Sequence, residues 1–157
     1  MPETGELYEH DFFLWTQEQA AGLRRAKASN LPLDWENLAE EIESLGKSDR
    51  RELASQVTRI LRHLLKLTIS PAAEPRAGWR SSVNEARSQI ELLLEDSPSL
   101  RREVDSLIQK QVRAAAKLAA ADLEQHREPA EALRALLERG GFTAEQVLGD
   151  WFPDTQA

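Results

Sequence analysis

The chain has 157 residues, a length typical of one domain, and it contains no cysteine, which excludes disulfides, thiolate catalysis and cysteine-based metal sites. Its formal net charge of −7 argues against a general binder of nucleic acid or of anionic membranes, because such proteins are basic overall. The first residues lack the basic and apolar regions of a signal peptide, and no apolar run approaches the about 18 residues of a membrane span. We therefore expect a cytoplasmic protein without membrane association.

Apolar residues recur at helical spacing along nearly the whole chain, and no segment alternates in the manner of a strand. This pattern predicts an all-α fold, a compact bundle of about five main helices with a short C-terminal helical tail. We expect a single helical domain over residues 1–157, with its core at about 8–153.

The first half of the sequence predicts three helices. The first extends from Asp11, as its N-cap, to about Ala28. The second extends from Asp34 to Gly46, which we interpret as the glycine that follows a helix end. The third covers about 48–69, so the two meet in a hairpin at Gly46-Lys47. The apolar stripe of the helix over 34–46 is predicted to face inward and consists of Trp35, Leu38, Ile42 and Leu45.

The second half predicts helices over about 78–95, 98–127 and 130–139. Ser97-Pro98 is typical of a helix start, and Pro129 interrupts the helical pattern. Gly140-Gly141 ends the helix over 130–139, and Thr143 with Gln146 predicts a capping box for a last short helix. The segment 151–153 is expected to fix the C-terminal end to the body of the protein.

Several sequence strings together resemble a bacterial family, the domain of unknown function number twenty-nine. They are Tyr8-Glu9-His10-Asp11-Phe12 with Trp15, the segment 37–46, His63-Leu64-Leu65-Lys66, Trp79-Arg80 with Arg87, the segment 95–101 and Trp151-Phe152-Pro153. The resemblance covers about 8–153 and implies an all-helical fold and a bacterial source, but no activity. The segments 112–116 and 67–71 depart from the family, which often has aromatic residues there.

Acidic residues are densest at Glu36, Glu40, Glu41 and Glu43. Small helical nucleotide pyrophosphatases hold Mg²⁺ with such clusters, so a metal-assisted phosphohydrolase that uses Glu41 and nearby acids is one alternative function. The helical phase places Glu36, Glu40 and Glu43 opposite the apolar stripe, however, and leaves only Glu41 and Asp34 beside it. We therefore predict a solvated acidic face, with no metal site and no cofactor.

One candidate pocket combines Glu41, His63, Arg80 and Asp122. His63 lies at the edge of an apolar stripe, and Asp122 and Gln111 are polar residues on the inner face of the helix over 98–127, where Arg80 or Arg87 could supply a partner. A Glu41–His63 acid–base pair is disfavoured, because the hairpin would bring His63 to the neighbourhood of Asp34 and Trp35 instead.

Basic residues concentrate in 47–94, where nine bases and five acids give a net charge of +4. They include a line at helical spacing that forms a candidate interaction face, namely Arg51, Arg59, Arg62 and Lys66. This face suits an acidic protein partner or the acidic face of a second copy in a homodimer. Nucleic acid is a further alternative, which the overall charge and the lack of interleaved aromatic residues disfavour.

The sequence contains no recognisable catalytic constellation. It therefore favours an uncharacterised bacterial helical protein that acts as a non-enzymatic protein-interaction or self-associating module. A metal-assisted phosphohydrolase and an accessory nucleic-acid binder remain the two alternatives.

Overall fold

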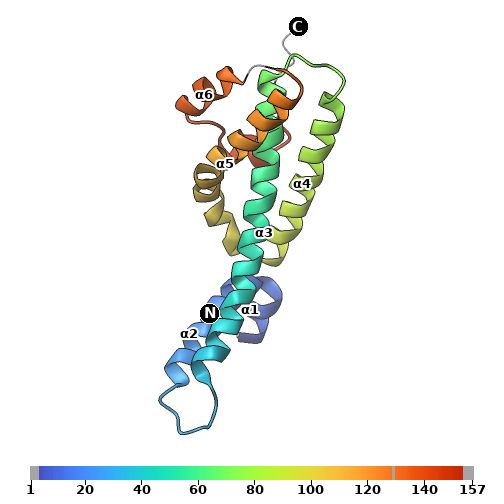
Figure 1. Ribbon diagram of the computed structural model, residues 1–157. Coiled ribbons are helices and arrows are strands. Elements are labelled where there is room, and N and C mark those ends of the chain that lie inside the picture. The colour runs from blue at the N-terminus through green and yellow to red at the C-terminus, as the bar shows by residue number, and fades with distance from the viewer. Residues whose placement is uncertain (1–3, 129, 154–157) are drawn as a thin grey trace. The chain divides into compact units, whose positions relative to one another are not determined.

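A computed structural model describes residues 4–128 and 130–153, and within them every regular element is a helix, as predicted (Figure 1). The elements are α1 (Thr4–His10), α2 (Phe12–Ala26), α3 (Trp35–Ile69), α4 (Arg76–Asp96), a 3-10 helix η1 (Pro98–Glu103), α5 (Val104–Gln125), α6 (Glu131–Glu138) and α7 (Ala144–Leu148). Among these described helices, none has the length and apolar character needed to cross a lipid bilayer.

Contacts divide the chain into two compact units. Within the described residues, the first unit comprises 4–53 and 91–102, and the second comprises 54–90 and 103–153. Each of the long helices α3 and α4 therefore contributes one part to each unit.

In the first unit, the buried carboxylate of Asp11 holds two chain segments. It accepts a hydrogen bond of 3.0 Å from the backbone N–H of Leu14, which confirms the predicted N-cap of α2. It also accepts hydrogen bonds from the backbone N–H and the hydroxyl of Ser99, at 2.8 and 2.7 Å. Ser97, the expected cap of the next helix, instead accepts a bond of 2.9 Å from the backbone N–H of Phe13. The first turn of η1 is thereby tied to the start of α2.

The predicted helix end at Gly46 is wrong, because α3 continues through it without interruption. Gly46 is buried against α2, and a Cβ atom at this position would collide with the hydroxyl of Thr16 and lie 3.3 Å from the ring of Phe13. The glycine is therefore needed for close helix packing rather than for a turn. The expected hairpin at Gly46-Lys47 is absent, so His63 is not folded back toward Asp34 and Trp35.

The orientation expected for the start of α3 is also wrong. Ala39 is fully buried and Gly46 packs against α2, whereas Leu38 and Leu45 are exposed. The close approach at Gly46 requires small residues on the side that meets α2. The leucine side of the helix consequently faces away from this contact.

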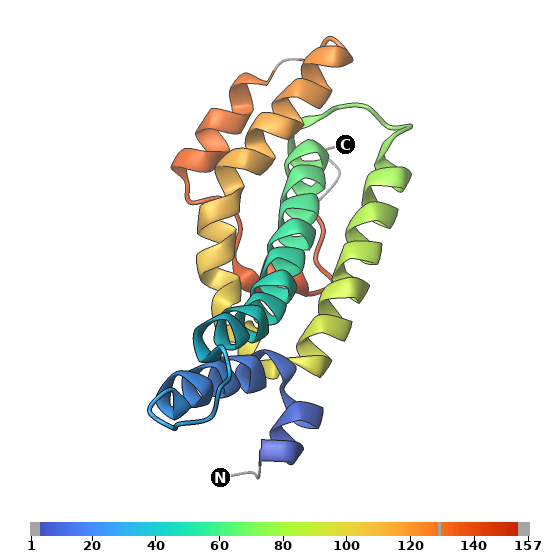
Figure 2. The same ribbon diagram turned by 60° about the horizontal axis from the view of Figure 1, so that its bottom comes forward.

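The second unit has the leucine-rich core that the sequence predicts. Its parts of α3, α4 and α5 lie side by side (Figure 2). Their almost fully buried side chains include Val57, Ile60, Leu61, Leu64, Leu65, Val83, Ala86, Ile90, Leu107, Ala115, Ala119 and Leu123.

The C-terminal segment is fixed to α4 by Arg87. This buried guanidinium donates hydrogen bonds to the backbone carbonyls of Gln146, Val147 and Trp151 at 2.6–2.9 Å, and it lies 4.7 Å from the ring centroid of Phe152. The capping box of Thr143 and Gln146 and the positive φ angles at positions 140 and 141 confirm the predicted local signals. The expected break at Pro129 lies outside the described residues.

Candidate functional site

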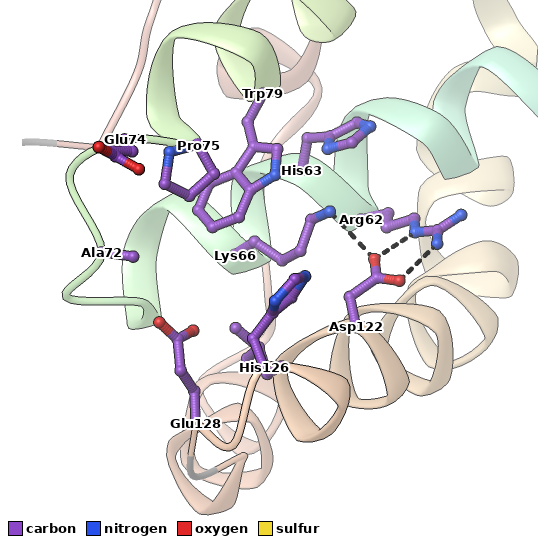
Figure 3. Close-up of a pocket in the computed structure, with 11 residues that line it drawn as sticks. Arg62, His63, Lys66, Ala72, Glu74, Pro75, Trp79, Asp122, His126 and Glu128 are labelled. Atoms are coloured by element: carbon purple, nitrogen blue, oxygen red, sulfur yellow. Dashed lines mark hydrogen bonds and ion pairs between the residues drawn. The ribbon is translucent and has the colours of Figure 1, made fainter.

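A pocket of about 810 Å³ opens in the second unit, beside α3 and α5 and the loop that leads into α4 (Figure 3). We call it the second-unit pocket. Its lining residues are Arg62, His63, Lys66, Ala72, Glu74, Pro75, Trp79, Asp122, Leu123, His126 and Glu128.

Two cations share one carboxylate at one side of this pocket. Asp122 accepts two hydrogen bonds of 2.7 Å from Arg62, one at each oxygen, and its Oδ2 also lies 3.0 Å from the Nζ of Lys66. These bonds, those from Arg62 above all, lower the pKa of Asp122 to about 2, so the carboxylate is charged at neutral pH. The cluster therefore has one positive charge in excess.

Lys66 is buried, so the predicted position on an exposed basic face is wrong. Its side chain is only 7% exposed, and its Nζ lies 4.9 Å from the ring centroid of Trp79. The bond to Asp122 and the aromatic face together compensate for the water that this ammonium loses.

His63 lies beside the cluster as a half-buried neutral side chain. Burial lowers its pKa to about 4, and the positive charges of Lys66, Arg62 and Arg59 contribute in the same direction. Its Nδ1 is buried and forms no hydrogen bond with the described residues. The histidine therefore experiences a positive electrostatic potential.

The loop between α3 and α4 is held by polar contacts at the pocket edge. The hydroxyl of Ser70 contacts both carboxylate oxygens of Glu128 at 2.9 and 2.8 Å, and Arg76 donates to the backbone carbonyls of Ser70 and Leu67. These contacts hold the loop in place at the edge of the pocket.

The structure brings together only half of the predicted pocket. His63 and Asp122 line it, whereas Arg80 lies 5.3 Å from the ring centroid of Phe152 and Glu41 is exposed in the first unit. The expected pairing of Asp122 with Arg80 or Arg87 is wrong, because Arg62 and Lys66 are its partners. One signal was present in the sequence: α3 has no acid after Glu52, so the bases in its second half need carboxylates from other helices.

The four bases of the predicted interaction face have different surroundings. Arg62 and Lys66 line the pocket, Arg59 forms an ion pair of 2.9 Å with Glu85 of α4, and Arg51 is exposed in the first unit. They therefore do not form one continuous solvated stripe.

The acidic cluster lies on the surface of the first unit, as expected. Glu36 and Glu43 form ion pairs with Arg24 at 3.2 and 2.8 Å, and Glu40 and Glu41 are exposed. Across residues 4–128 and 130–153, no group of three or more acids and histidines is placed to hold a metal ion.

A second candidate site, not recognised from the sequence, is an apolar and acidic surface on the first unit. Four leucines near the start of α3 have exposed fractions of 41–61%. Steps of three or four residues lead along one side of the helix from Asp34 to Leu38, Glu41 and Leu45, and no base lies on this path. We call this surface the leucine–acid face. It comprises Asp34, Leu38, Glu41 and Leu45, and the exposed Leu31 and Leu33 precede it in the chain.

Comparison with known proteins identifies the family but no activity. Residues 7–152 match the family described as "Domain of unknown function DUF29", so the chain belongs to this family. It is also similar to the crystal structure of an alpha-helical protein of unknown function from Rhodospirillum rubrum ATCC 11170. The two share 34% sequence identity over 90% of this chain and 88% of that chain, with a TM-score of 0.66. Among curated proteins, none matches this chain significantly.

Proposed function

We propose that this member of the DUF29 family is a non-enzymatic interaction module whose leucine–acid face binds a basic amphipathic helix of another protein. The proposal rests on one observation: the exposed Leu38 and Leu45 lie seven residues apart on one side of α3, with Glu41 between them. Leucines at this spacing are typical of a helix that contacts another helix.

The distribution of exposed apolar residues supports a specific binding surface. Of the eight large hydrophobic residues that are exposed among the described residues, six belong to the first unit. Because these side chains are already about half covered, burying the rest of one in an interface contributes about 1 kcal/mol. A partner that covers Leu38 and Leu45 therefore gains several times the thermal energy.

The charge of the first unit supports a basic partner. Residues 1–46 contain ten acids and three bases, which gives a net charge of −7. A second copy would place the same acids opposite one another, because a twofold interface pairs a surface with itself. The alternative is a homodimer through the basic face of Arg51, Arg59, Arg62 and Lys66. It is weakened because three of these four bases already form ion pairs with Glu85 or Asp122.

Titration with a designed peptide tests the proposal. The probe is a fluorescent helical peptide with leucines at seven-residue spacing flanked by lysines, and a version with glutamates in place of the lysines is its control. We expect saturable binding of the basic peptide, with affinity that falls as salt is added. Leu45→Asp is expected to weaken binding at least tenfold, because it places a charge in the apolar contact.

Leu118→Asp is the matched control, because Leu118 is an exposed leucine of α5 in the second unit. Equal binding of both peptides, or equal loss with Leu118→Asp, would contradict the proposal. A wild-type dimer in sedimentation that Leu45→Asp dissociates would instead show that this face binds a second copy.

A further inference from the structure

The second-unit pocket has the dimensions and the mixture of groups of a small-molecule site. Its volume of about 810 Å³ lies within the range of about 300–1,000 Å³ that such sites occupy. Apolar side chains line part of its wall, and the charged groups of α3 and α5 lie together on one side (Figure 3). None of its residues belongs to the leucine–acid face, so this site is independent of the function proposed above.

The cluster of Arg62, Lys66 and Asp122 at one side of the pocket has one more positive charge than negative charge. Both oxygens of Asp122 already accept hydrogen bonds from Arg62, and Oδ2 also pairs with Lys66. A lysine ammonium has three N–H donors, and Asp122 accounts for one of them. Lys66 is only 7% exposed but lines the pocket, so an acceptor on a ligand in the pocket would reach the donors that Asp122 does not use.

His63 lies beside the same cations. The histidine stays neutral at neutral pH because burial and the nearby cations Lys66, Arg62 and Arg59 disfavour its protonation. The same cations that disfavour a further positive charge favour a negative one.

The pocket edge limits the charge of the ligand. Glu74 is exposed at one edge, and Glu128 lies at another in contact with Ser70. These carboxylates repel a ligand with several negative charges, such as a phosphate or a nucleotide. They repel a single carboxylate at the buried Lys66 less strongly, because it has one charge and lies beside two cations.

We propose that the second-unit pocket binds a small organic monocarboxylate. The carboxylate accepts hydrogen bonds from Lys66 and Arg62, beside Asp122. The apolar part of the ligand lies against Trp79, Pro75 and Leu123.

Isothermal titration calorimetry near neutral pH tests this proposal with three probes: phenylacetate, the uncharged phenylacetamide and inorganic phosphate. We expect saturable binding of phenylacetate and at least tenfold weaker binding of the other two, because only phenylacetate has both a single negative charge and an apolar ring. Lys66→Met removes the ammonium at similar side-chain length and is expected to weaken phenylacetate binding at least tenfold. Lys110→Met changes an exposed lysine of α5 outside the pocket and is expected to leave binding unchanged.

Circular dichroism shows whether Lys66→Met is folded. If this variant is unfolded, the three probes on the wild-type protein still test whether the pocket binds a monocarboxylate. A shift of the Trp79 indole resonance on addition of phenylacetate then shows that the ligand lies in this pocket. No binding of phenylacetate up to about 10 mM would overturn the proposal. Equal binding of phenylacetamide would exclude a role of the charge, and tighter binding of phosphate would identify a phosphate site instead.

Discussion

The two parts of α3 bury different kinds of residue. In the second unit, the helix buries Ile60, Leu61 and Leu64 completely. In the first unit it buries Ala39 and Gly46 and exposes Leu38 and Leu45, and its one fully buried leucine is Leu53, at the boundary of the units. The apolar period is helical in both parts, but the neighbour decides which side is covered. In the first unit, α2 approaches so closely at Gly46 that only small residues fit. An apolar stripe therefore indicates a contact, but not whether the contact is within the chain or with another molecule.

Truncation of one leucine in each part of α3 should give the largest difference in the free energy of unfolding. Leu61→Ala is expected to lower the free energy of unfolding by about 2–5 kcal/mol, because it empties a fully buried position. Leu45→Ala is expected to change it by about 0.5 kcal/mol or less, because the side chain is half exposed. Urea unfolding followed by circular dichroism measures both. Equal losses would remove the distinction between the two parts.

Removal of the Arg87 guanidinium should loosen the C-terminal segment of the second unit. Arg87→Met leaves the three carbonyls of Gln146, Val147 and Trp151 without their donor, and we expect a loss of about 2–4 kcal/mol. Hydrogen exchange should rise over 142–153. Arg80→Met is the control, because Arg80 lies over the same Phe152 ring. We expect it to lower the free energy of unfolding by about 1 kcal/mol. Similar effects of the two substitutions would argue against this role of the hydrogen bonds.

A methyl group at Gly46 tests the close packing of the first unit. Gly46→Ala is expected to destabilise the protein by about 1–3 kcal/mol, because the new Cβ meets Thr16. Gly22→Ala in α2 is the control: its Cβ would meet only the end of the Arg25 side chain, 3.8 Å away, so the helix should gain about 0.5–1 kcal/mol. Thermal unfolding measures both changes. A gain with Gly46→Ala would contradict the packing argument.

The two units each contain an ionisable group that changes the stability of the protein with pH, and the two changes should have opposite signs. This is the smallest effect expected. The pKa of His63 in the folded protein lies below its ordinary value of 6.5, at about 4, so the unfolded chain binds more protons between these values. The stability that the neutral form of His63 provides is therefore complete above pH 6.5 and is lost as the pH falls toward 4. Allowing for solvent screening, wild type should lose about 1 kcal/mol more than His63→Gln over this range.

Asp49 in the first unit should act in the opposite direction. Its pKa is raised by burial and by the nearby Asp96, so its folded form gains stability as the pH falls through that pKa. Asp49→Asn is therefore expected to increase stability near neutral pH. Urea unfolding at several pH values measures both residues, and a steeper acid loss in His63→Gln than in wild type would contradict the sign assigned to His63.

Local signals in the sequence predicted much of the fold. The N-cap at Asp11 and the capping box of Thr143 and Gln146 depend on residues three positions apart, so a single helical turn contains the whole interaction. The inner stripes of the second unit also follow directly from the helical period.

Signals that depend on distant residues were not predictable in this way. Gly46 has the residue type of a helix end, and only the position of Thr16 in α2 shows that it is a packing contact. Likewise, Asp122 was recognised as a buried acid that needs a partner, but its partner Arg62 lies 60 residues away. Both residues are visible in the sequence, but the helical period of each helix does not show that the two side chains contact each other.

The contact between Asp11 and Ser99 has a consequence for how the protein forms during synthesis. These residues are 88 positions apart in the chain, yet their hydrogen bonds complete the N-terminal unit. Because translation is vectorial, α2 leaves the ribosome well before its distant partner does. The N-terminal unit therefore lacks these hydrogen bonds until more than half of the polypeptide has been made.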